Sequence, residues 1–261
     1  MKRLLLIILS LVLLLSACGG DKIDKEALSE LNAAIKNTNA EASISGKYML
    51  EITFSDSVTL YYASGDAAWD KEAGKASAIF SQTYLGSSSE GANYFANGKV
   101  LSVGSEDAIE VERSKDALFA LFPYVNAFEV QESVESLSVT QSTLGRAYTV
   151  TTDNTEEICQ AVIGGDIFTI VEVLKKPQPD KTKYGKATCT YTVGDDGRLA
   201  AVRYEFDVTL YDTPAYIPGY SVPEDDYSIT LHVAARISYN GFGDEVEIAE
   251  YSRDESSEIS S

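Results

Sequence analysis

The chain has 261 residues, with 21 Lys plus Arg against 40 Asp plus Glu and a formal net charge of −19 at pH 7. So acidic a surface repels nucleic acid and anionic lipid headgroups, which excludes nucleic acid as a partner. Hydrophobic residues make up 44% of the chain, enough to bury a core that needs no disulfide or metal staple.

The N-terminus has the pattern of an export signal. Lys2 and Arg3 precede twelve residues, Leu4–Leu15, that are apolar except for Ser10. A helix of that length is about 18 Å long, well short of the ~30 Å hydrocarbon core of a bilayer. Residues 1–17 are therefore predicted to be a cleaved signal peptide and not a transmembrane anchor.

Leu15-Ser16-Ala17-Cys18 resembles the lipobox of bacterial lipoproteins, in which the cysteine thiol receives a diacylglyceryl group and the chain is cut just before it. The alternative is an ordinary secretory signal followed by a chance cysteine. Two or three acyl chains hold a protein lastingly on a membrane. The resemblance implies an extracytoplasmic protein anchored to the outer face of the cell membrane through Cys18, with residues 18–22 as its tether.

A short amphipathic helix follows the tether. Between residues 23 and 36, apolar side chains recur at helical spacing with charged residues between them. They are Ile23, Ala27, Leu28, Leu31 and Ile35.

Three later segments alternate apolar and polar residues over eleven to thirteen positions: 44–54, 200–210 and 227–239. Each predicts an antiparallel strand with one apolar face. Such strands span roughly 36–43 Å, about twice the usual length, which disfavours an immunoglobulin-like sandwich. A large sheet of long strands must twist and coil, so we expect a closed or partly closed barrel whose apolar face points inward.

Shorter strands complete a single domain over residues 23–249, with hairpin turns at Asn97-Gly98 and at residues 194–197. The sequence thus predicts a mainly β (α+β) fold. These strands are expected at Val58–Ala63, Ala76–Tyr84, Tyr94–Val103, Val134–Thr140, Tyr148–Thr151 and Thr182–Val193.

Two further helices are predicted between the strands, over Lys115–Val125 and Glu156–Ile163. The first is apolar on all sides, because its centre carries Leu118, Phe119, Leu121 and Phe122. A helix without a polar face either lies buried in the core or lines an apolar cavity, and both interpretations stay open.

Two cysteines follow Cys18. Cys159 and Cys189 could form a disulfide outside the cytoplasm, or each could serve as a small buried apolar residue. The last residues, 250–261, are mostly Ser and Glu without periodicity and are expected to form a disordered acidic tail.

The residues of common enzymes are missing. The only histidine, His232, falls on the polar face of its predicted strand, so neither a histidine triad nor a multi-histidine metal site can be built. Ser-x-x-Lys, Gly-x-Ser-x-Gly, Cys-x-x-Cys and phosphate-binding glycine loops are absent. Acidic clusters at 195–196 and 224–226 fit turn chemistry. We therefore expect no enzyme, catalytic residue, metal or cofactor.

Taken together, the lipobox, the leading helix and the long strands make the chain resemble the LolA/LppX-like half-barrel lipoproteins, particularly uncharacterised Gram-positive members. The likeness is carried by Ser43–Tyr48, Gly91–Lys99, Arg198–Phe206 and Tyr239–Ile248. It implies a large curved antiparallel sheet that forms an incomplete β-barrel, with inserted helices on its concave side. In the family that arrangement encloses an apolar cavity that carries acyl chains.

Two functions follow as hypotheses. In the first, the anchored protein binds a lipid or other apolar ligand in a cavity between sheet and helices. Its lining would be Leu118, Phe119, Leu121 and Phe122, with Tyr48, Leu50 and Ile52 opposite. In the second, the protein has a solid core and no ligand, and is an anchored module that contacts other envelope proteins.

Replacing Cys18 by Ser should abolish lipidation and leave unprocessed precursor, because both the thioether and the following cut need that thiol. Detergent partitioning and the mass of the cell-bound protein measure this. Normal processing of the Cys18→Ser chain would refute the anchor.

Overall fold

The computed structural model describes residues 23–54, 58–104, 108–112, 134–163, 182–211, 228–243 and 246–251. The predicted signal peptide, Cys18, the predicted helix over Lys115–Val125 and residues 252–261 lie outside these ranges.

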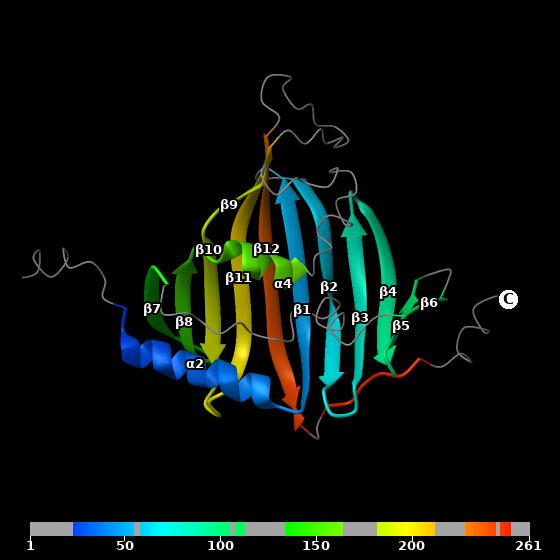
Figure 1. Cartoon of the computed structure of the whole chain (residues 1–261), viewed down its shortest axis with the longest axis horizontal. Coiled ribbons are helices and arrows are strands. Elements are labelled where there is room, and N and C mark those ends of the chain that lie inside the picture. The colour runs from blue at the N-terminus through cyan, green and yellow to red at the C-terminus, as the bar shows by residue number, and fades with distance from the viewer. Residues whose placement is uncertain are drawn as a thin grey trace, which may run out of the picture.

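The described chain is dominated by one antiparallel sheet that does not close into a barrel (Figure 1). Its strand order is β6-β5-β4-β3-β2-β1-β12-β11-β10-β8-β7, and β9 pairs with β11 off this path. The strands are β1 Ser43–Phe54, β2 Val58–Asp70, β3 Lys75–Tyr84, β4 Ser87–Ala96, β5 Lys99–Val103, β6 Ala108–Glu112, β7 Ser136–Ser142, β8 Gly145–Thr152, β9 Thr182–Tyr184, β10 Ala187–Val193, β11 Leu199–Tyr211 and β12 Ser228–Phe242. The predicted mainly β fold, an incomplete barrel, is confirmed.

The three long alternating segments are β1, β11 and β12, and each buries one face. In β11, for example, Val202, Tyr204 and Phe206 are buried whereas Arg203 is exposed. The buried residues of neighbouring strands stand opposite one another, as with Val202 and Ile237. Their side chains form one continuous apolar face on the concave side of the sheet.

Several predicted strand limits differ from the structure. β2 runs beyond Ala63 to Asp70, because its weakly β-forming residues around Gly65 are paired on both sides, by β1 and β3. The predicted strand Thr182–Val193 is interrupted between β9 and β10, where the Gly185 N–H donates to the Asp207 carbonyl at 2.8 Å. β6 was not predicted.

The sheet consists of two meanders joined at their ends. β1–β6 follow one another in sheet order, and β12 pairs with β1 from Ile44↔Phe242 to Phe54↔Leu231. Residues 246–251 then continue to β3 and β4, where Lys75 Nζ donates to a Glu250 carboxylate oxygen at 2.6 Å and the Ala249 N–H donates to Ser77 Oγ at 3.2 Å.

Helices α2 (Lys25–Ala40) and α4 (Thr155–Ile163) both lie on one face of the sheet (Figure 1). They match the predicted helices, although α2 continues past Lys36. The Asp24 carboxylate caps α2 by accepting from the Glu26 and Ala27 N–H groups at 2.9 and 3.2 Å. Neither described helix is long and apolar enough to cross a membrane.

Thr38 connects α2 to the sheet. Its hydroxyl donates to the Ala34 carbonyl at 2.9 Å and accepts from the Leu199 N–H at 2.8 Å, and its side chain is fully buried. It therefore satisfies a backbone donor at the start of β11 that faces away from water.

Thr38→Val keeps the side-chain shape but leaves the Leu199 N–H unpaired, so the free energy of unfolding should fall by about 1–3 kcal/mol. Chemical denaturation measures the change. Thr59→Val is the matched control: Thr59 is exposed and its hydroxyl reaches only a Glu51 oxygen at 3.4 Å, so a change within about 0.5 kcal/mol is expected. Equal costs at both positions would contradict this role of Thr38.

Candidate functional site

The sheet side of the predicted lining lies on the concave face of β1. Tyr48, Leu50 and Ile52 alternate with residues on the opposite face, and their partners on β12 include Ile237 and Val233. Leu50 and Ile52 are buried and Tyr48 is partly buried. The helix side of the lining, Leu118, Phe119, Leu121 and Phe122, lies outside the described residues.

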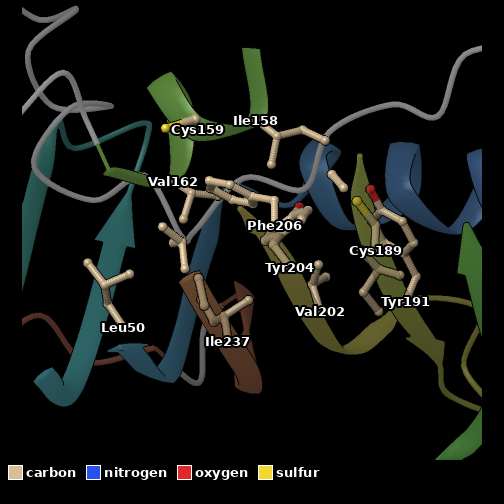
Figure 2. Close-up of a cluster of buried hydrophobic side chains, with 14 of the residues drawn as sticks. Leu50, Ile158, Cys159, Val162, Cys189, Tyr191, Val202, Tyr204, Phe206 and Ile237 are labelled. Carbon is tan, nitrogen blue, oxygen red and sulfur yellow. The ribbon is translucent and has the colours of Figure 1, made fainter. Parts of the chain in front are cut away.

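α4 closes one half of the concave face. Ile158 and Val162 extend from this helix toward Phe206 of β11, with Leu50 and Ile237 further down the sheet (Figure 2). Val162 is fully buried and Ile158 is 5% exposed. Their burial in one cluster with the sheet side chains means that α4 packs directly on the strands. The residues under α4 therefore belong to the hydrophobic core.

Cys159 of α4 and Cys189 of β10 are free and buried. The sequence left open a disulfide or two buried thiols, and the structure has the two buried thiols. Burial raises the pKa of each thiol to about 12, in Cys159 with a smaller contribution from the charge of Glu156. Both stay protonated at neutral pH, and a protonated thiol is a poor nucleophile and a poor metal ligand.

The concave face of β2 and β3 carries a group of small side chains between larger ones. Ala67 stands opposite Ala78, Ala76 lies opposite Trp69, and all of these alanines are buried. Neither α2 nor α4 lies over this part of the sheet (Figure 1). Trp69 stands at one end of these small residues and Tyr61 at the other, and Phe80 lies opposite Gly65. We call this surface the alanine floor; it consists of Ala63, Gly65, Ala67, Ala76 and Ala78.

Two glycines shape the floor. A Cβ on Gly65 would lie 2.1 Å from the Ile79 carbonyl oxygen, so only glycine lets β2 and β3 approach there. A Cβ on Gly91 would lie 2.9 Å from Cζ of Phe80, so the Phe80 ring lies across β4. Neither role is visible in the sequence, because each glycine is far along the chain from the residue that it contacts and neither belongs to a turn pattern.

The two ends of the alanine floor differ in polarity. Trp69 and Phe95 are buried at one end. At the other, the Tyr61 hydroxyl donates to Gln82 Oε1 at 3.2 Å and Tyr48 lies nearby. Burial raises the pKa of both tyrosines; for Tyr48, Tyr61 and the charge of Asp66 add to the effect. Both hydroxyls therefore stay neutral hydrogen-bond donors at physiological pH.

A second hollow lies where β11 and β12 part. Their pairing stops at Ala201↔Ser238, while β12 continues beside β1 to Phe242. The resulting pocket of 730 Å³ is lined by Gly194, Asp195, Asp196, Arg198, Leu199, Ala200, Tyr239, Asn240, Gly241 and Phe242.

Arg198 connects the two sides of this pocket. Its guanidinium lies 4.2 Å from the Phe242 ring centroid and donates to a Glu41 carboxylate oxygen at 2.9 Å. Asp196 accepts from the Arg198 N–H at 3.0 Å, and this hydrogen bond lowers the pKa of its carboxyl group. Asp196 thus has the predicted turn role, while the acids at 224–226 lie outside the described residues.

His232 is on the surface, as predicted. Its Nδ1 lies 2.8 Å from Asp207 Oδ1, and its side chain is 49% exposed. Within the described part of the chain, no three His, Cys, Asp or Glu side chains gather in a way that could hold a metal ion.

No family model matches the chain, and no curated protein matches it in sequence. Among solved structures, it is similar to lipoprotein LppX of Mycobacterium tuberculosis (12% identity, 87% of this chain and 100% of that chain, TM-score 0.45). It is also similar to LprF of Mycobacterium bovis (13%, 87% and 98%, 0.46) and to a LolA-superfamily protein of Nitrosomonas europaea (9%, 87% and 94%, 0.28). LolA/LppX-like proteins are thus among the matches, as the resemblance predicted. Such distant likenesses concern the fold alone.

Ile158→Ala tests whether the half under α4 is solid. Removing a buried side chain from a close-packed site should lower the free energy of unfolding by about 2–5 kcal/mol. Ile79→Ala is the control, because Ile79 is 50% exposed and should cost less than about 1 kcal/mol. A similarly small cost for Ile158→Ala would mean that α4 covers a void.

Proposed function

We propose that this chain is an extracytoplasmic lipoprotein, anchored through lipid on Cys18, that holds a lipid or other apolar ligand on the concave face of its sheet. The alanine floor is the observation that carries the proposal. Ile158 and Val162 of α4 pack on one half of the concave face, whereas β2 and β3 present alanines and Gly65 where β11 and β12 present large side chains.

Dispersion and desolvation would supply the affinity. An acyl chain laid along the alanine floor would contact methyl groups below and the rings of Trp69, Phe80 and Phe95 around it. Each buried CH₂ contributes ~0.8 kcal/mol, so about ten such groups supply ~8 kcal/mol, the free energy of micromolar binding. Few hydrogen bonds are needed for such a ligand.

The polarity of the two ends suggests how the ligand lies. Its most apolar part would reach Trp69 and Phe95, and a hydroxyl or carbonyl group would meet Tyr61, Gln82 and Tyr48. Since a hydroxyl donates to a carbonyl oxygen without a net charge, a neutral polar group fits this end.

The anchor would keep this surface near its source of lipid. α2 begins at Lys25, seven residues after Cys18, and seven extended residues span at most about 25 Å. The acidic body would meanwhile be repelled by anionic headgroups. Lipid exchange would therefore take place close to the bilayer while the domain, residues 23–249, stays outside it.

The alternative function is an anchored interaction module with a solid core. The direct packing of Ile158 and Val162 of α4 on the sheet favours it for the half of the interior that they fill. The two functions differ in what occupies the space above the alanine floor, and this difference can be measured.

Ala78→Leu places a larger side chain in the middle of the alanine floor. In the soluble form that begins at Gly19, we expect lipid in an organic extract of the unmodified chain. Affinity for a fluorescent apolar probe should fall at least about threefold, or ~0.65 kcal/mol, in the variant. Mass spectrometry of the extract and probe titration measure these effects.

Ala92→Leu is the matched control, because Ala92 lies on the neighbouring strand β4 but on the opposite face, across from Ile79. It should leave probe affinity unchanged. An unmodified chain that carries no lipid and binds no probe, with Ala78→Leu destabilised by overpacking, would remove the carrier function and leave the interaction module.

A further inference from the structure

β7 is an edge strand of the sheet, and β8 is the one described strand that pairs with it. Its four central residues, Ser138, Val139, Thr140 and Gln141, are all exposed. Along such an edge, alternate residues turn their backbone N–H and C=O groups away from the sheet and can pair with another chain.

This edge lacks the usual protection against pairing. β7 reads SLSVTQS, with no charge, no proline and no glycine, and its register with β8 runs from Ser136 to Ser142 without a bulge. Proteins commonly protect edges with lysines, prolines or bulges. The opposite edge, β6, differs, because its sequence AIEVE includes Glu110 and Glu112.

Apolar surface gathers at the same hairpin. Val139 of β7 is 39% exposed, and Leu144 in the turn to β8 is 55% exposed. They are two of the five exposed large hydrophobic residues in the described part of the chain. Burying both requires a partner along this edge.

The charges beside β7 are neutralised within the chain. Arg146 pairs with Glu30, and Lys186 pairs with Glu135 at 2.5 Å. The edge is therefore locally neutral although the chain carries a net charge of −19. A second copy can approach here without placing like charges in contact, whereas an acidic or basic peptide finds no free opposite charge on β7 itself.

We propose that β7 is a self-association edge, at which two copies of the chain pair their β7 strands antiparallel about a two-fold axis through Val139. This register uses the whole strand: Val139 meets its own counterpart, Ser138 meets Thr140 of the second copy, and Ser136 meets Ser142. The two sheets become one continuous sheet. A two-fold contact of this kind is self-complementary.

Seven residues a side are far fewer than the roughly 20–30 of a standard interface, so the dimer is weak and depends on local concentration. The proposal is independent of the ligand proposed above. Cross-linking of the full chain in its own membranes suits a weak contact of this kind.

Val139→Cys in the full chain tests the register. Opposed Cα atoms in antiparallel strands lie about 4.5–5.5 Å apart, within the range of roughly 4.4–6.8 Å found for disulfides. Under copper–phenanthroline oxidation, the variant should give at least fivefold more covalent dimer than the unmodified chain. Ile79→Cys is the matched control, since Ile79 is more exposed than Val139 but lies far from β7, and should stay at baseline.

A second pair of variants tests the same register without changing Val139, in case Val139→Cys disturbs folding. Ser138→Cys and Thr140→Cys face away from the core, and the register predicts strong cross-linking when both are present and weaker cross-linking with either alone. Adding Thr140→Lys to the Val139→Cys chain should reduce the covalent dimer at least fivefold, because each copy would then place a charged lysine in the paired edge. Baseline cross-linking by both Val139→Cys and the double variant, in chains with unchanged thermal midpoints, would overturn the proposal.

Discussion

The pairing of β1 with β12 is the constraint on which the rest of the structure depends. It joins the meander β1–β6 to β12, β11 and β10, and so makes one sheet of segments at opposite ends of the chain. It also makes the concave face continuous, because Leu50 and Ile52 of β1 continue the apolar rows of β11 and β12. α2 directly precedes β1 in the chain, and its Thr38 hydroxyl accepts a hydrogen bond from the Leu199 N–H of β11. The helix therefore connects the two sides of this junction.

An apolar sheet face of this size must be covered, and the two halves are covered differently. Over β11, β12 and β1, side chains of α4 are buried in one cluster with those of the strands, which stabilises the fold. Over β2 and β3, alanines and Gly65 replace the large aliphatic residues of the first half. Small residues forgo some of the burial energy that a Leu or Ile would provide, so their concentration on one half is a cost to stability that a ligand could offset.

The sequence predicted the faces of the strands better than their partners. Alternation assigns Leu50, Ile52 and Phe206 to one face, and His232 to the other, because side chains of a strand alternate strictly. Nothing in that period identifies β12 as the neighbour of β1. Break points such as Gly185, which depend on a hydrogen bond to Asp207, were equally invisible.

The same limit applies to the candidate site. Leu50 and Ile52 could be chosen from β1 alone, but the alanine floor exists only because register sets Ala67 beside Ala78 and Ala76 beside Trp69. In the sequence, these alanines look like any weakly β-forming stretch, which is also why β2 was predicted to end at Ala63. Small residues become informative once the strands that carry them are known to be adjacent.

Leaving the barrel open has a structural consequence at the edges. A closed barrel has no edge strands, whereas an open sheet keeps two and must protect or use each. The glutamates of β6 and the neutral, exposed β7 are opposite solutions to that problem in one molecule. The edge that the open sheet leaves at β7 is the one with the chemistry to pair with a second copy. The proposed self-association would then follow from the fact that the sheet does not close into a barrel.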